Sequence, residues 1–423
     1  MRLKQLWMTQ QNKFVFQKII PLGINTFKGR STEAIISLPY SYWGALAIIS
    51  KSGYGKSVLL KRVYSYLLYY YNMLLKKNRC GVIFDMTAED HYLSAYRNPE
   101  PMPLFKGETI FGFENLKNYA PTFVKDECFG FDHVFGFHIK DIDNRDFNSM
   151  HLNHTTIREF DTLIKNNLNK IDDFDFFVEQ VNFMPTRQPK APNKKKDIYK
   201  MPVCKLKCDH LINPQVKNAM ISFLSNMQIN EVFINSYDKR YKLSFDKDLL
   251  DGYVVVVNFH QAREFAPLYA GLILKDIYFK RRNSIREKKG IEAPVIIIEE
   301  ADLLLPRDDL FLEQGSNKWL TEILRRGRKY GFYTVLATQQ VSSINPMIKD
   351  HIQTWIIGSL TSKDLNFFEQ IFSSEIMNVI YSLNQIPNER GAREWIVVYN
   401  NQEFDTFRPY NSPVKIHKVQ NSV

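Results

Sequence analysis

The chain has 423 residues, of which 44% are hydrophobic and 24% are charged. Such a chain can bury a substantial apolar core, which excludes global disorder, and its length suits one large domain with an insertion, or two domains. The 56 Lys and Arg residues exceed the 45 Asp and Glu residues by +11, which favours a polyanionic partner such as nucleic acid, although solubility alone also explains the excess.

The first part of the chain predicts a β-α-β unit. Residues 1–40 read as a short segment of strands and turns, with prolines and glycines between them. The apolar run Trp43–Ser50 then predicts a buried strand of a parallel sheet, followed by a helix over 56–77 and a second strand over 80–86. Residues 41–89 therefore begin an α/β core.

The pattern changes over residues 90–250, where turns, scattered aromatic residues and helical stretches replace the alternation of strands and helices. Within this region, the basic loop 186–207 carries eight basic residues and one acidic residue, with prolines between them. A solvated surface loop is the usual interpretation of such a stretch, and contact with a DNA backbone is the alternative. We interpret residues 90–250 as an insertion into the core.

The alternation resumes in residues 251–423. Predicted strands cover Tyr253–Phe259, Val295–Ile298, Phe332–Ala337, Trp355–Leu360 and Glu394–Tyr399. Helical stretches separate several of these strands, which predicts an α/β fold with a mostly parallel sheet and helices on both faces.

A phosphate-binding loop is predicted between the first buried strand and its helix. The segment reads SKSGYGKS from Ser50, and the residues that would cradle the phosphates are Ser52, Gly53, Tyr54, Gly55, Lys56 and Ser57. Glycines let consecutive backbone amides turn towards phosphate, and the helix N-terminus adds partial positive charge. Lys56 can reach the β- and γ-phosphates of ATP and the Ser57 hydroxyl can ligate Mg²⁺, while Ser50 stands where the usual pattern has glycine.

Two carboxylates follow the predicted strand at 295–298. Glu299 is assigned to the surroundings of Mg²⁺ and Glu300 to polarising the attacking water, because strand ends of an open α/β sheet gather at the edge where the phosphate loop lies. The alternative is that both glutamates end the strand and face solvent.

With these motifs in this order, the sequence resembles the HerA/FtsK superfamily of translocating ATPases, and HerA more than FtsK. The segment Glu299–Asp302 resembles the acidic pair of that family, and Ile323–Gly331 resembles its helix ending in Arg-Lys-aromatic-Gly. The strand Val335–Ser342 resembles the one that ends in a sensor glutamine, with Gln340 and Val341 where Arg-Pro usually follows. Asp85 and Glu89 match acidic positions after the second strand.

The resemblance implies a RecA-like fold and a homo-oligomer, a hexameric ring with ATP at the subunit interfaces. An arginine would reach the γ-phosphate of a neighbouring subunit, with Arg328 the first choice and Arg325 and Arg326 next. Helical spacing puts Arg325 and Arg328 on one face of the helix. The alternative to the trans-acting role is that these arginines form a solvated or DNA-facing helix surface. Gln339 would sense the γ-phosphate, or else be a buried structural glutamine.

The function that the resemblance favours is ATP-driven translocation of double-stranded DNA. Only some 40 residues precede the core, so the N-terminal β-barrel of HerA is expected to be absent or vestigial. This favours a viral or plasmid motor that packages or transfers DNA, with a capsid or membrane docking partner, over a HerA-type helicase working with a nuclease. A conjugation or secretion ATPase that moves protein ranks below both of these DNA motors, and a non-motor P-loop switch ranks last.

The remaining signals are weaker. Cys204, Cys208 and His210 lack the tighter spacing and second pair that zinc sites usually show. Four cysteines in a long chain indicate free thiols in a reducing compartment, and nowhere do 18 apolar residues follow one another. We therefore expect a cytoplasmic protein with no transmembrane segment.

Overall fold

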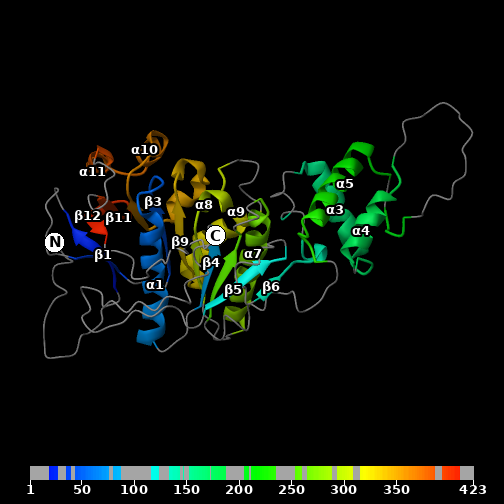
Figure 1. The fold of residues 1–423 in the computed structure, drawn as a ribbon, viewed down its shortest axis with the longest axis horizontal. Helices are drawn as coiled ribbons and strands as arrows, with labels where there is room; N and C mark the ends of the chain where they lie inside the picture. The colour runs from blue at the N-terminus through cyan, green and yellow to red at the C-terminus, as the bar shows by residue number, and fades with distance from the viewer. Residues whose placement is uncertain are drawn as a thin grey trace, which may run out of the picture.

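A computed structural model describes most of the predicted elements (Figure 1). The described residues are 19–26, 35–39, 43–75, 80–86, 116–122, 133–142, 146, 152–171, 173–186, 204–208, 211–234, 253–259, 264–287, 293–307, 315–385 and 393–409. Glu89 and residues 187–203 of the basic loop lie outside them.

The described residues form one twelve-stranded sheet with the order β2-β1-β12-β11-β10-β3-β9-β8-β4-β7-β5-β6. The strands are β1 (Ile19–Asn25), β2 (Ile35–Pro39), β3 (Gly44–Ile49), β4 (Gly81–Asp85), β5 (Leu116–Pro121), β6 (His133–Phe135), β7 (Val254–Asn258), β8 (Val295–Ile298), β9 (Tyr333–Thr338), β10 (Thr354–Ile357), β11 (Trp395–Tyr399) and β12 (Glu403–Pro409). Neighbours from β10 to β6 are parallel, whereas β11, β12, β1 and β2 add antiparallel pairs at the other end. The predicted mostly parallel α/β sheet is confirmed.

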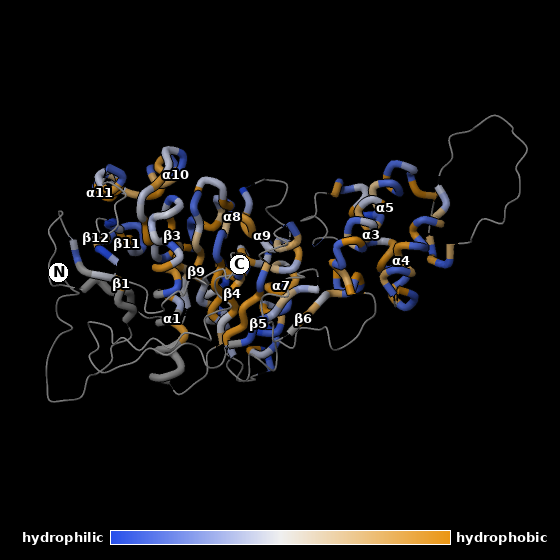
Figure 2. Tube along the Cα trace, in the orientation of Figure 1, coloured by the Kyte–Doolittle hydropathy of each residue, from blue (hydrophilic) through white to orange (hydrophobic). Residues whose placement is uncertain are grey.

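Helices cover both faces of this sheet, as predicted. They include α1 (Lys56–Leu75), α7 (Ala266–Arg286), α8 (Ala301–Leu304), α9 (Gly315–Tyr330), α10 (Ser362–Phe368) and α11 (Ser374–Gln385), with 3-10 turns η8 (Val341–Ser343) and η9 (Pro346–His351). Val295 and Ile297 of β8 share a buried cluster with α1, while Ile296 and Ile298 belong to the cluster that includes α7 and α9. Because both faces are buried, the strands read as continuous apolar runs, and Figure 2 shows hydrophobic residues gathered along the middle of the sheet.

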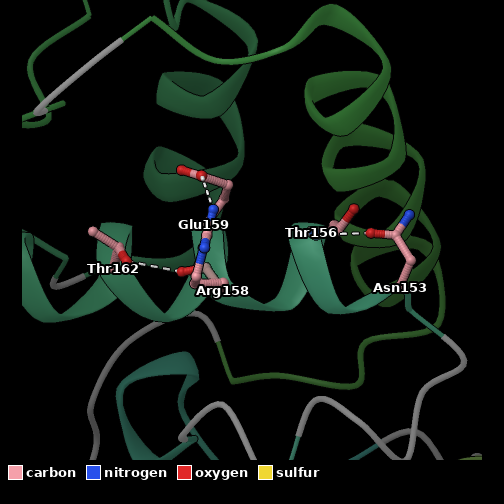
Figure 3. A network of polar contacts seen from close by, with 5 residues as sticks. All are labelled: Asn153, Thr156, Arg158, Glu159 and Thr162. Atoms are coloured by element: carbon pink, nitrogen blue, oxygen red, sulfur yellow. Dashed lines mark hydrogen bonds and ion pairs between the residues drawn. The ribbon is translucent and has the colours of Figure 1, made fainter.

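The inserted region contributes a helical group beyond the β6 edge (Figure 1). It contains η4 (Ile139–Asp141), α3 (His154–Asn167), α4 (Phe174–Asn182) and α5 (Pro214–Ile229). Each of the three α-helices begins with an Asn or Asp N-cap; at α3 the Asn153 side chain accepts a 2.8 Å bond from the Thr156 amide (Figure 3). On α7, the buried Tyr269 hydroxyl donates to the Val232 carbonyl and its ring contacts Phe137, which joins this group to the core.

Two segments that the sequence placed outside the core also pair with its sheet. β1 and β2 come from residues 1–40, and β5 and β6 come from residues 90–250. The boundaries of the ATPase core and of the insertion stay predictions. Among the described helices, none combines the length and apolar character needed to cross a bilayer.

Candidate nucleotide-binding site

The loop from Ser50 to Ser57 connects β3 to α1 in the conformation that a phosphate-binding loop requires. Gly53 and Gly55 have φ values of +75° and +94°, which only glycine adopts easily. The Lys51 amide donates to the Ser359 carbonyl at 2.8 Å, which ties the loop to the end of β10. Residues of this loop line a hollow at the N-terminus of α1.

Tyr54 and Ser50 anchor the base of this loop. The Tyr54 side chain is buried and its hydroxyl donates to the Glu394 carbonyl at 2.9 Å; burial raises the pKa of this hydroxyl, so it remains a donor. Ser50 is buried against Gly358, where a Cβ would lie 2.9 Å from the Ser50 Cβ. The missing side chain at Gly358 makes room for serine in place of the usual glycine.

A cavity of about 260 Å³ opens in front of the loop and brings together residues far apart in the sequence. Its lining consists of Lys51, Ser52, Gly53, Gly55, Lys56, Ser57, Val58, Leu60, Glu299, Glu300, Ala337, Gln339 and Arg393. The sheet order explains why these residues meet: β9 lies next to β3, β8 lies next to β9, and the carboxyl ends of these parallel strands share one edge. Five of the six residues predicted to bind nucleotide line the cavity; Tyr54 instead faces the core.

The carboxylates are close enough to act electrostatically on Lys56. Burial lowers the pKa of Lys56, and the nearby carboxylates of Asp302, Glu299 and Glu300 act in the opposite direction. A polyphosphate in the cavity would also favour the charged ammonium. The cavity therefore combines a cation with acidic groups that can hold a metal ion.

The two glutamates occupy different environments at the end of β8. Glu299 is 3% exposed, whereas Glu300 lies at the start of α8 with φ 49° and ψ 57°. This left-handed conformation is strained for a non-glycine residue, and such strain concentrates at functional sites. The Asp302 carboxylate, two residues on, accepts a 2.9 Å bond from the Thr338 hydroxyl and so links α8 to the end of β9.

Comparison with known proteins found similarity in fold and in part of the sequence. No protein-family model matches the chain. A DNA double-strand break repair helicase HerA from Sulfolobus acidocaldarius is 28% identical over 109 residues, 25% of this chain and 21% of that protein. VirB4 of Thermoanaerobacter pseudethanolicus shares the fold, with a TM-score of 0.57 and 12% identity over 96% of this chain and 99% of that one.

A bacterial conjugative coupling protein, TrwBdeltaN70, also shares the fold, with a TM-score of 0.54 and 12% identity over 97% of this chain and 92% of that one. Over 25–33% of its length the chain is therefore similar in sequence to HerA helicases, and it shares its fold with VirB4 and the coupling protein. It spans only 18–25% of the length of the curated relatives that it matches.

Gln339 lies where the sequence predicts a γ-phosphate sensor. It follows β9 directly, is half-buried and lines the cavity. Of the two residues at the usual Arg-Pro positions, Gln340 accepts a 3.0 Å bond from the Ser343 hydroxyl and Val341 is buried in η8. Both therefore serve the turn that follows Gln339.

The arginines of α9 do not line the cavity of their own chain. Arg325 and Arg326 both pair with Glu322, the latter at 2.8 Å, whereas the Arg328 guanidinium lies 5.4 Å from the ring centroid of Trp43. Trp43 precedes β3, at the end opposite to the phosphate loop. A role for Arg328 at the nucleotide of a neighbouring subunit stays a prediction.

Two charged residues of the cavity were given no role by the sequence analysis. Arg393 lies just before β11, and its guanidinium is 5.9 Å from the Tyr54 ring centroid. No local pattern marks it, because its place in the cavity depends on how β11 pairs across β10. Lys51 also lines the cavity, from within the loop itself.

The donors present fit Mg²⁺. The Ser57 hydroxyl and the Glu299 carboxylate line the same cavity, and oxygen atoms are the ligands that Mg²⁺ prefers. At the discounted zinc motif, the Cys204 and Cys208 thiols lie 3.9 and 3.7 Å from the Leu206 carbonyl, and His210 lies outside the described residues.

Proposed function

We propose that the chain is an ATP-hydrolysing translocase of double-stranded DNA. One observation carries the proposal: a single cavity at the end of β3 is lined by residues that lie far apart in the sequence, namely Lys56, Glu299, Glu300 and Gln339. A cation, acidic groups and an amide around a phosphate loop are the parts that phosphoryl transfer to water needs. The superfamily resemblance and the match to a DNA repair helicase support DNA as the substrate that is moved.

Each residue has a chemical task in this proposal. Loop amides and the Lys56 ammonium hold the β- and γ-phosphates of ATP, which concentrates positive charge where negative charge develops. Mg²⁺, held by Ser57 and Glu299, would neutralise charge on the β- and γ-phosphate oxygens. Glu300 accepts a proton from the attacking water, and its strained backbone aims the carboxylate from the end of β8 into the cavity.

Coupling to DNA movement is proposed to follow from γ-phosphate loss. The Gln339 amide hydrogen-bonds the γ-phosphate, and the segment after it is tied to α10, because the Ser342 amide donates to the Asp364 carboxylate at 3.0 Å. Arg328 from an adjacent subunit of a hexameric ring completes the site. Each hydrolysis event then changes a subunit interface as well as a pocket.

Within this proposal, a viral or plasmid motor that packages or transfers DNA ranks first. A HerA-type helicase working with a nuclease is the second candidate, favoured by the sequence match to HerA. A conjugation or secretion ATPase is the third; the likeness to VirB4 and the coupling protein is one of fold.

The decisive experiment measures ATP hydrolysis with and without duplex DNA. We expect the wild-type chain to hydrolyse ATP, duplex DNA to accelerate turnover, and Lys56→Ala to show neither activity. Equal turnover in Lys56→Ala would refute the site. Turnover that ignores duplex DNA but responds to a protein substrate would refute DNA translocation and favour the secretion ATPase.

A further inference from the structure

Besides Lys51 and Lys56 of the loop, the cavity has a cation, Arg393, on the side opposite the carboxylates. In the sheet order β11-β10-β3-β9-β8, the phosphate loop follows the central β3. Glu299, Glu300 and Gln339 reach the cavity from the ends of β8 and β9, whereas Arg393 reaches it from the start of β11. Because β11 runs antiparallel to β10, its first residues lie at the same edge as the carboxyl end of β10.

The Arg393 guanidinium is held against the phosphate loop. It lies over the Tyr54 ring, with 5.9 Å to the centroid, and its Nη1 is 3.7 Å from the position that a Cβ on Gly55 would take. Tyr54 is in turn fixed by the Glu394 carbonyl and by the Trp395 ring at 5.3 Å. The guanidinium therefore rests on a rigid surface beside the loop amides.

The hydrogen-bonding state of Arg393 leaves it ready for an anion. Its Nε atom is buried and, among the described residues, finds no acceptor. The adjacent Glu394 carboxylate faces Arg408 instead, with 3.6 Å between Oε1 and Nη2. A buried guanidinium nitrogen without an acceptor is costly unless a ligand supplies one.

We propose that Arg393 binds the α- and β-phosphates of the nucleotide within its own subunit, an inference that rests on the proposed nucleotide site. The γ-phosphate lies towards Glu300 and Gln339, so a cation entering from the β11 side meets the inner phosphates. Guanidinium–phosphate contacts are charge-assisted and frequently bidentate. Arg393 therefore contributes equally to the affinity for ADP and for ATP. Gln339 differs, because it contacts only the γ-phosphate.

The test compares ligand affinities by calorimetry in the presence of Mg²⁺. The proteins are the wild type, Arg393→Ala, Arg393→Lys and, as a matched control from the other side of Glu394, Arg408→Ala. The ligands are ATPγS, ADP and inorganic tripolyphosphate. We expect Arg393→Ala to weaken all three by a similar factor, roughly 10- to 100-fold, Arg393→Lys to recover part of the loss, and Arg408→Ala to bind as the wild type does.

The outcomes separate the two levels of inference. A wild-type chain that binds none of the ligands refutes the nucleotide site itself. A wild type that binds them, with Arg393→Ala binding equally well, overturns only the role of Arg393. A loss of affinity for ATPγS alone would mean that Arg393 contacts the γ-phosphate. A loss of affinity for both nucleotides but not for tripolyphosphate would mean that it contacts the base or the ribose. Either result overturns the proposal. If Arg393→Ala does not fold, Arg393→Gln replaces it, with unfolding temperatures measured without ligand.

Discussion

Gly358 supports the phosphate loop from behind, so adding one methyl group there should disturb the site without touching it. A Cβ at Gly358 would lie 2.6 and 2.8 Å from two ring carbons of Tyr54 and 2.9 Å from the Ser50 Cβ. Carbon atoms in contact normally lie about 3.5–4.0 Å apart, so these groups would have to move by about 1 Å. Tyr54 cannot retreat easily, because the Glu394 carbonyl and Trp395 hold it from the other side.

We expect Gly358→Ala to lower the free energy of unfolding by about 1–3 kcal/mol, the usual effect of overpacking a core. Since Ser50 and Tyr54 belong to the loop, nucleotide affinity should fall as well. Urea unfolding with and without ATPγS measures both effects. Gly327→Ala is the matched control: its nearest neighbour would be the Phe332 carbonyl oxygen at 3.4 Å, and alanine favours a helix, so stability should change little or rise. Wild-type stability and affinity in Gly358→Ala would refute this account of the loop.

Three further predictions concern catalysis, assembly and pH. Glu300→Gln should bind ATP as the wild type does but hydrolyse it about 10²- to 10⁴-fold more slowly in a single-turnover assay, because the amide cannot accept a proton from water; undiminished hydrolysis would reassign the base. Arg328→Ala should retain ATP binding and lose turnover. Mixing Arg328→Ala subunits with Glu300→Gln subunits should restore some hydrolysis at mixed interfaces. Mixtures that never recover hydrolysis would contradict a trans role. Burial lowers the pKa of His351 below its ordinary 6.5. The unfolded chain therefore binds this proton at a higher pH than the folded chain does, and the free energy of unfolding should fall as pH drops through 6.5. His351→Gln should weaken that fall in urea unfolding curves measured from pH 7.5 to pH 5.

Several structural features were predictable because they depend on neighbours along the chain. The glycine pattern around Lys56 and the apolar run before it define a strand, a turn and a helix by local backbone preference alone. The acidic pair after 295–298 could be placed near this loop because carboxyl ends of parallel strands share one edge. The α/β fold was predictable for the same reason.

Other features depended on strand order, which no local pattern encodes. Residues 1–40 could be read as strands but not as the partners of β12, since antiparallel pairing over such a separation depends on which edge the rest of the sheet leaves free. Likewise, β5 and β6 lie within a stretch that looked like an insertion, yet β5 pairs with β7.

Taken by itself, the sequence determined the chemistry of the phosphate loop and the carboxylates, because each is carried by a few consecutive residues. Tertiary structure alone decided which distant groups join them: Arg393 against Tyr54, Asp302 against Thr338, and Arg328 against Trp43 at the far end of β3. These contacts arise from packing between elements far apart in the chain, where side-chain reach and strand order matter and sequence spacing does not.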